Sequence, residues 1–216
     1  MKTPQIKICG LTRTEEADFL NQVKADYAGF VFFEKSKRNV TFAQAEDIQK
    51  GLSPDIKRVA VTVSPDVTLC QKIMEYGFDI LQVHGELKPE VLEQCRLPIW
   101  RACNMEKPEE LGKLEHHEKI TAYVVDAKTA GSGQTFDWQG SRELAEKKEY
   151  YFQGKAFVLA GGLNSQNAAE GIKLFAPDVV DISSGVERSP GEGKDQGLIM
   201  EFVKKVRENR PAVVRI

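Results

Sequence analysis

Short apolar runs recur along the whole chain, separated by polar and mixed stretches. Most of the runs are continuously apolar rather than alternating, which is typical of parallel strands that are covered on both faces. The pattern therefore predicts strands at Gln5–Cys9, Tyr27–Phe33, Lys57–Val63, Ile80–His84, Ile99–Ala102, Ala122–Asp126, Phe157–Ala160 and Val179–Ser183.

Helical patterns lie between these runs. Thr12-Arg13-Thr14-Glu15 and Thr41-Phe42-Ala43-Gln44 both have the spacing of a capping box, which marks a helix start. Apolar residues of Asp66–Tyr76 fall on one helical face, and Gly77 then ends the pattern. The charged stretch Glu106–Lys119 is expected to be a solvated helix face. Further helices are predicted at Ser141–Glu149, Ser165–Phe175 and Asp195–Asn209.

About eight strand–helix repeats give a parallel sheet when each crossover is right-handed. The sheet could be an open, doubly wound one or a closed (β/α)₈ barrel. The barrel is favoured by the number of units and by the reactive residues that fall at the carboxyl ends of strands. The 216 residues suffice for one buried core, so we expect a single α/β barrel domain over residues 1–216 with short loops.

Composition and charge narrow the class of partner. The formal net charge is -2 and no basic stripe occurs, which argues against nucleic acid. No apolar run approaches the roughly 20 residues that cross a bilayer, and the first residues do not form a signal peptide. The 4 cysteines lack metal-binding spacing, so we expect reduced thiols, no metal site and a cytoplasmic protein.

Two polar turns follow the last two predicted strands directly. Gly161-Gly162 comes after Phe157–Ala160, and Ser183-Ser184-Gly185 comes after Val179–Ile182. Such turns leave free backbone N–H groups at the edge of the sheet, and two of them side by side can bind a phosphate. This is the usual place of the phosphate site in a (β/α)₈ barrel.

Two reactive residues end other strands at the same edge. Cys9 ends the first strand and could serve as a base or nucleophile if its pKa is lowered toward neutrality. Taken alone, Cys9 is better explained as a small core residue beside the turn at Gly10. Asp126 follows a mainly apolar run, and desolvation there would raise its pKa and suit a general acid. A helix cap or a loop salt bridge is the alternative for Asp126.

Other polar residues have weaker signals. Arg38 could pair with a substrate carboxylate or be a solvated loop cation. His84 could shape the pocket or donate a hydrogen bond, or it could be a structural histidine. Asp181 could contact a sugar hydroxyl or pair with a lysine inside the barrel. The glycine-rich stretch Gly131–Trp138 suggests a mobile lid.

Taken together and in order, these motifs resemble the phosphoribosylanthranilate isomerase family. The resemblance covers nearly the whole chain. It rests on Lys7-Ile8-Cys9-Gly10-Leu11-Thr12, Gly29-Phe30-Val31-Phe32-Phe33, Ser36-Lys37-Arg38-Asn39-Val40, Leu81-Gln82-Val83-His84-Gly85, Gly131–Trp138, Leu159–Asn164, Asp181–Glu187 and Lys194-Asp195.

The resemblance implies a barrel of the ribulose-phosphate-binding type and an Amadori rearrangement of N-(5-phosphoribosyl)anthranilate in tryptophan biosynthesis. By analogy Asp126 would protonate the furanose oxygen and Cys9, as thiolate, would remove the C2 proton. Arg38 would hold the anthranilate carboxylate, and the turns at Gly161-Gly162 and Ser183-Ser184-Gly185 would hold the phosphate. Protons move within one molecule, so no cofactor is implied. The partner would be a small phosphoribosyl substrate, and the chain a monomer or homodimer.

Two positions depart from the expected pattern. Lys37 stands where we expect proline, which adds charge near the carboxylate site, and Gln134 stands where we expect lysine in the lid. Two other functions stay open at this point. The related isomerase of histidine biosynthesis performs the same rearrangement, but we expect an aspartate there in place of Cys9. A non-catalytic phosphosugar-binding barrel would need neither Cys9 nor Asp126.

Overall fold

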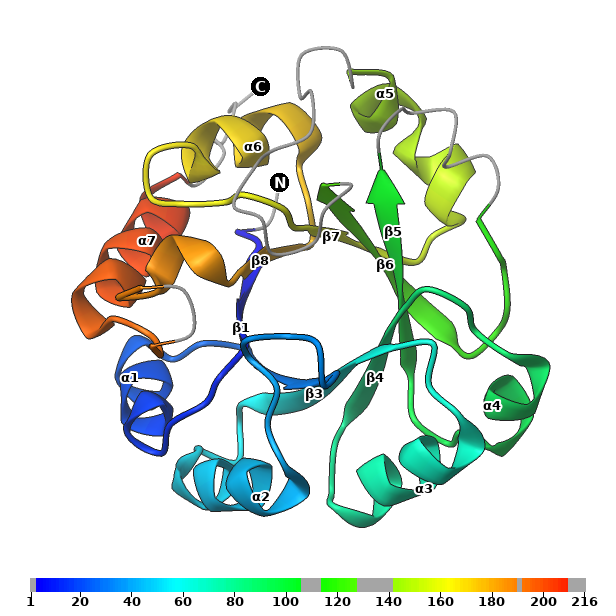
Figure 1. Ribbon diagram of the computed structural model, residues 1–216. Helices are drawn as coiled ribbons and strands as arrows, with labels where there is room; N and C mark the ends of the chain where they lie inside the picture. Colours follow the sequence, from blue (N-terminus) through cyan, green and yellow to red (C-terminus); the bar gives the residue numbers. More distant parts are fainter. Residues whose placement is uncertain (1–2, 106–113, 128–141, 190–191, 210–216) are drawn as a thin grey trace.

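The computed structural model describes residues 3–105, 114–127, 142–189 and 192–209, and its centre is a closed barrel of eight parallel strands (Figure 1). Each strand pairs with its neighbours in chain order, and β8 closes the barrel against β1. The predicted (β/α)₈ barrel is confirmed, and all eight predicted strands are present. The strands are β1 Gln5–Cys9, β2 Tyr27–Phe32, β3 Lys57–Val63, β4 Ile80–His84, β5 Ile99–Met105, β6 Ile120–Ala127, β7 Ala156–Leu159 and β8 Val179–Ile182.

Helices surround the barrel on its outside (Figure 1). They are α1 Glu15–Val23, α2 Phe42–Gly51, α3 Val67–Glu75, α4 Pro89–Gln94, α5 Arg142–Phe152, α6 Ala168–Phe175 and α7 Gln196–Glu208, with a 3₁₀ turn η2 at Ser184–Val186. The sequence pattern gave no prediction for the short helix α4. The expected helix face at Glu106–Lys119 is wrong for residues 114–119, which form irregular chain followed by a turn, while residues 106–113 lie outside the described part.

Local sequence explains where several helices begin. The predicted capping box at Thr41 is present, with the Thr41 hydroxyl and the Gln44 side chain exchanging hydrogen bonds with each other's backbone. The box predicted at Thr12 is wrong. The buried carboxylate of Glu16 accepts hydrogen bonds from the backbone N–H groups of Thr12 and Arg13, at 2.7 and 3.2 Å, and α1 begins only at Glu15.

The alternation of side chains along each strand divides the core into two layers. One apolar cluster fills the barrel and the other lies between the barrel and its helices. On β1, for example, Cys9 belongs to the inner cluster, whereas Ile6 and Ile8 belong to the outer one. The inner cluster contains Cys9, Val59, Val61, Ile80, Trp100, Ala102, Ala122, Val124, Val158, Ala160 and Val179.

Parallel pairing brings the carboxyl ends of all eight strands to one rim. Cys9 at the end of β1 and Asp126 near the end of β6 therefore come to the same side of the barrel, together with the turns after β7 and β8.

Within the described residues, no helix is long and apolar enough to cross a membrane. That residues 1–216 form a single domain stays a prediction, because both ends of the chain lie outside the described part.

Candidate active site

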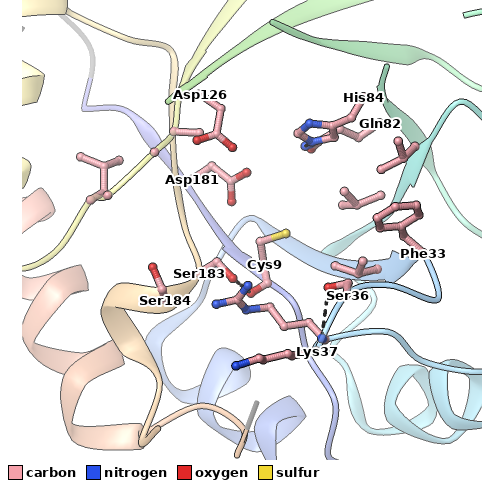
Figure 2. A pocket seen from close by; sticks show the side chains of 18 of the residues that line it. Cys9, Phe33, Ser36, Lys37, Gln82, His84, Asp126, Asp181, Ser183 and Ser184 are labelled. Atoms are coloured by element: carbon pink, nitrogen blue, oxygen red, sulfur yellow. Dashed lines mark hydrogen bonds between the residues drawn. The ribbon is translucent and has the colours of Figure 1, made fainter. Parts of the chain in front are cut away.

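A cavity of about 370 Å³ opens at the carboxyl rim of the barrel. Figure 2 shows the carboxylates of Asp126 and Asp181 on one side of it, His84 and Gln82 opposite them, and the sulfur of Cys9 between the two groups. The cavity is lined by Cys9, Val31, Phe33, Lys35, Ser36, Lys37, Arg38, Val61, Val63, Gln82, His84, Asp126, Ala160, Gly161, Gly162, Leu163, Asp181, Ser183 and Ser184.

Cys9 is held at the mouth of the barrel by its neighbours. The hydroxyl of Ser183 donates to the carbonyl oxygen of Cys9 at 2.9 Å, which ties the end of β1 to the turn after β8. Gly29 on β2 leaves room for the thiol, because a Cβ there would lie 2.8 Å from the Cys9 sulfur. The side chain is largely buried but reaches the cavity. Cys9 is therefore positioned as a group that faces a ligand rather than as simple core filling.

A base at Cys9 is expected to have a pKa lowered toward neutrality, but the structure raises the pKa of this thiol. Burial raises the pKa of the thiol above its usual value, and it outweighs the neighbouring cations Lys7 and Lys194, which lower it. The negative charge of Asp181 raises it further. In the ligand-free protein the thiol is thus mostly protonated at neutral pH.

Asp126 sits inside the barrel on β6 and is 8% exposed. Its strand neighbours Val124 and Val125 are fully buried on opposite faces, so the alternation of β6 places Asp126 on the inner face with Val124. It lines the same cavity as Cys9 although the two residues are far apart in sequence. A carboxyl group and a thiol thus face one space.

A buried ion pair lies beneath them. Lys7 and Asp181 are register partners on β1 and β8, and Lys7 Nζ lies 2.6 Å from Asp181 Oδ2. Burial alone would lower the pKa of Lys7, but the charges of Asp181 and Cys9 and their hydrogen bonds with Lys7 together outweigh burial and raise the pKa. The other oxygen of this aspartate, Oδ1, is buried and has no partner within the described part of the chain, and the residue lines the cavity. Both alternatives considered for Asp181, a lysine partner and a ligand contact, are compatible with this geometry.

Gln82 and His84 form the opposite wall (Figure 2). Gln82 Nε2 lies 3.0 Å from His84 Nε2, and both side chains are at most one-tenth exposed. The amide oxygen of Gln82 is buried without a partner among the described residues. A buried acceptor without a partner is costly unless a ligand satisfies it, so Gln82 is a candidate contact that the sequence analysis did not single out.

Arg38 is not a solvated cation. Its side chain is 15% exposed and makes a two-pronged ion pair with Glu187, from Nε to Oε1 and from Nη2 to Oε2 at 2.9 Å. Among the hydrogen bonds of the described residues, none involves Arg38 Nη1. Lys35 and Lys37 also line this side of the cavity, so it is rich in positive charge.

The two predicted phosphate turns meet at the rim. Gly161 and Gly162 have φ of +80° and +64°, a conformation that glycine adopts without strain. Ser184 begins the 3₁₀ turn η2, whose first N–H groups have no partner inside the turn. Gly162 and Ser184 both line the cavity. Their backbone N–H groups donate no hydrogen bond to other described residues, so they are available to an anion.

Gly185 has a different position from the other turn residues. It does not belong to the cavity lining, and a Cβ on it would lie 2.1 Å from the carbonyl oxygen of Leu163. The residue therefore lets the two turns pack against each other.

The predicted lid Gly131–Trp138, with Gln134, lies outside the described residues.

Four charged or polar residues of the site had not been assigned a role from sequence, namely Lys7, Gln82, Glu187 and Lys194. Lys7 and Gln82 carried a signal, because each interrupts an apolar strand at a position that alternation turns inward. Among the described residues, no cluster of three or more histidine, cysteine or carboxylate side chains could hold a metal ion. The arrangement provides a proton donor, a proton acceptor and an anion site around one space.

Comparison with known proteins agrees with this geometry. A family model described as "PRAI: N-(5'phosphoribosyl)anthranilate (PRA) isomerase" matches residues 6–205. A curated relative from Thermoanaerobacter pseudethanolicus, named N-(5'-phosphoribosyl)anthranilate isomerase, is 36% identical over an alignment of 210 residues. The match covers 94% of this chain and 98% of the relative.

Solved structures are similar over nearly the same length. Phosphoribosyl anthranilate isomerase from Thermotoga maritima is 31% identical with a TM-score of 0.83, covering 95% of this chain and 99% of that one. A second structure, of a phosphoribosyl anthranilate isomerase in complex with reduced 1-(o-carboxyphenylamino)-1-deoxyribulose 5-phosphate, is 30% identical with a TM-score of 0.81 and the same coverage. A further structure from Thermotoga maritima concerns monomers generated from a dimeric enzyme, and it is 32% identical with a TM-score of 0.80.

Proposed function

The chain belongs to the N-(5'-phosphoribosyl)anthranilate isomerase family, and we propose from this membership which of its residues perform the reaction. The enzyme converts N-(5-phosphoribosyl)anthranilate to 1-(2-carboxyphenylamino)-1-deoxyribulose 5-phosphate in tryptophan biosynthesis. The observation that carries the assignment of roles is that Cys9, Asp126 and residues of both phosphate turns line one cavity. The alternatives of a histidine-pathway isomerase and a non-catalytic barrel have no comparable support.

Asp126 is the general acid in this proposal. It donates its proton to the furanose ring oxygen while the bond from that oxygen to C1 breaks. The lone pair of the anthranilate nitrogen forms the new double bond to C1, which gives an open-chain, protonated Schiff base. The carboxyl group is suited to this step because it is nearly buried in the cavity wall, where bulk water does not compete for the proton.

Cys9 is the general base for the next step. Its sulfur accepts the proton from C2, and the electrons of the C–H bond form a C1–C2 double bond as the nitrogen becomes neutral. The resulting enolamine gains a proton at C1 and loses one from the C2 hydroxyl, which yields the ketone. Burial raises the pKa of the resting thiol, so the positive Schiff base formed by Asp126 is needed beside it to favour the thiolate. Ring opening therefore prepares the base.

The remaining site residues hold the substrate in register. The phosphate binds to backbone N–H groups of the turns at Gly161-Gly162 and Ser183-Ser184-Gly185. Within the substrate, the phosphate is remote from the reacting carbons. Its binding energy can thus orient the sugar. The unpaired oxygen of Asp181 accepts from a sugar hydroxyl, and His84 contacts the substrate from the opposite wall.

Arg38 binds the anthranilate carboxylate through its guanidinium. Arg38→Ala is therefore expected to raise KM for phosphoribosylanthranilate about tenfold or more, because a charge-assisted hydrogen bond is lost. The value of kcat should change much less, since the carboxylate is not at the reacting carbons. Steady-state fluorescence kinetics separates the two constants.

The matched control for this variant is Arg13→Ala. Arg13 lies in the loop after β1, and its side chain is 47% exposed and paired with Glu15. It should leave both constants unchanged. An unaltered KM in Arg38→Ala would show that this arginine does not bind the substrate.

The activity itself is tested with freshly prepared phosphoribosylanthranilate beside the imidazole-carrying substrate of the histidine pathway. We expect turnover of the first substrate.

We also propose a cytoplasmic location, which suits the free thiols of Cys9, Cys70, Cys95 and Cys103. The chain would act as a monomer or homodimer, and one solved relative is described as dimeric.

A further inference from the structure

We propose that Glu187 is a positioning residue that aims Arg38 at the substrate's carboxylate, and that Lys194 adjusts the charge of this pair. The inference rests on the role proposed above for Arg38. It concerns three residues from two segments that lie far apart in the sequence. Arg38 lies in the loop after β2, and Glu187 and Lys194 lie in the connection between β8 and α7. We refer to Arg38, Glu187 and Lys194 as the charged trio.

The contact between Arg38 and Glu187 fixes the plane of the guanidinium. Two nitrogens of Arg38, Nε and Nη2, donate to the two oxygens of one carboxylate, and this parallel arrangement allows one relative orientation. The Glu187 side chain is 4% exposed, so the pair is not a loose surface contact. The carboxylate therefore uses the side of the guanidinium that includes Nε and leaves Nη1 for another anion.

The stem of Arg38 is confined as well. Gly10, directly after β1, has φ of +80°, and a Cβ on it would lie only 2.5 Å from Arg38 Cδ. The arginine thus crosses the chain at a point where only glycine leaves enough space. Its backbone N–H donates to the hydroxyl of Ser36 at 3.1 Å, which is the dashed line in Figure 2. The methylene chain, the backbone N–H and the guanidinium of Arg38 are all held by neighbouring residues. Arg38 therefore loses little rotamer freedom when the substrate binds.

Lys194 completes the trio from the other side of Glu187. Its Nζ lies 3.0 Å from Glu187 Oε1 and also donates to the carbonyl oxygen of Ser183 at 3.1 Å. Burial by itself raises the pKa of Glu187, but its hydrogen bond to Arg38 and the charge of Lys194 outweigh burial, and the net pKa lies below the usual value. Glu187 is therefore an anion. Burial lowers the pKa of Lys194, although the charge of Glu187 and its hydrogen bond oppose this effect.

The net charge of the trio matches the ligand. When Lys194 is protonated, two cations and one carboxylate leave a single positive charge, and Arg38 is the member of the trio that lines the cavity. One positive charge neutralises one substrate carboxylate. Without Glu187 the two cations would face each other unpaired in a buried place, which would favour displacement of the arginine from its present orientation.

The frame that holds Lys194 is also buried. The backbone N–H of Lys194 donates to Glu16 Oε1 at 2.5 Å, while the other oxygen of Glu16 accepts from the N–H of Thr12 at 2.7 Å. Glu187 and Lys194 form an isolated β-bridge that sets their side chains next to each other. The loops after β1 and β8 are thus joined around the trio, so its geometry is built before substrate arrives.

An alternative is that Glu187 occupies the place of the substrate's carboxylate and must be displaced by it. The two possibilities predict opposite signs. If Glu187 positions Arg38, its removal weakens binding, whereas if it competes, its removal strengthens binding. The ion pair between Glu187 and Lys194 fits both possibilities. Substitution of Glu187 distinguishes them.

The experiment compares two substrates in the variant Glu187→Gln. One is phosphoribosylanthranilate, and the other is the matching aniline compound, which lacks only the carboxylate. In Glu187→Gln we expect KM for the first substrate to rise about tenfold or more, with kcat changed less than about threefold. KM for the aniline substrate should barely change, so the preference for the carboxylate is reduced. Glu187→Asp should recover part of that preference.

Three further measurements keep the test decisive. Glu192→Gln, an exposed glutamate in the same connection, should behave as wild type. Binding of inorganic phosphate, measured by calorimetry, should stay unchanged in Glu187→Gln and shows that the variant is folded. In Arg38→Ala combined with Glu187→Gln, the preference should fall no further than in Arg38→Ala alone, because both substitutions remove the same contact.

The outcomes separate this inference from the function on which it rests. If Arg38→Ala loses the preference for the carboxylate and Glu187→Gln keeps it, the positioning role is wrong and the proposed role of Arg38 stands. If both variants keep the preference, the role of Arg38 is wrong as well. A lower KM in Glu187→Gln would identify Glu187 as a competitor for the guanidinium and overturn the inference.

Discussion

Cys9→Ala is expected to turn over phosphoribosylanthranilate at least about 10²-fold more slowly than the wild-type chain, because general-base catalysis contributes a factor of that order. The substitution removes the only group in the proposed mechanism that takes the C2 proton, while alanine fits the space. KM should change less, since the phosphate turns and Arg38 are left intact. Steady-state kinetics on purified variants measures both constants.

The matched control is Cys103→Ala. The Cys103 thiol packs against the outer apolar cluster rather than in the cavity, so its removal should leave kcat near the wild-type value. A second readout is the pH dependence of kcat/KM. The base acts as thiolate and burial raises the pKa of Cys9, so its contribution should grow as pH rises toward that pKa. Turnover near the wild-type rate in Cys9→Ala would remove Cys9 from the mechanism.

Asp126→Asn is expected to lower kcat by a comparable factor, on the order of 10² or more. Asparagine keeps the shape of the side chain but has no carboxylic proton to give to the ring oxygen. The sugar ring should then stay closed, and the thiol of Cys9 should never meet the positive Schiff base that favours its ionisation. Single-turnover experiments with enzyme in excess measure this loss without interference from product release.

The control for this variant is Asp55→Asn. Asp55 is exposed in the turn before β3, at the opposite end of the barrel from the cavity. It should have no effect on turnover. The account of Asp126 fails if Asp126→Asn retains more than about a tenth of the wild-type kcat, because ring opening would then have another source of protons.

The barrel could be predicted from sequence because its signals are local. Each strand is a short apolar run that needs no information from elsewhere in the chain, and Thr41 shows its capping box within four residues. Once the strands are parallel, Cys9 and Asp126 must share a rim, whatever the details of packing. The position of both residues at the cavity therefore follows from topology.

What sequence could not provide depends on contacts between distant segments. Thr12 has the same local spacing as Thr41, yet Glu16 satisfies its backbone and shifts the helix start. The Arg38–Glu187 pair joins residues 149 positions apart, and no local pattern indicates it. The direction of the Cys9 pKa likewise depends on how burial compares with the charges of Lys7, Asp181 and Lys194, which only the folded chain brings together.

The most direct test of the mechanism is a crystal structure of this chain with reduced 1-(o-carboxyphenylamino)-1-deoxyribulose 5-phosphate, the compound bound in the related structure. We expect the phosphate on the backbone N–H groups of Gly162 and Ser184, with the Cys9 sulfur about 3.5 Å from C2. The Asp126 carboxyl should contact the hydroxyl that derives from the ring oxygen. A phosphate bound elsewhere, or a sulfur and a carboxyl that cannot both reach the pentose, would contradict the proposed acid–base pair.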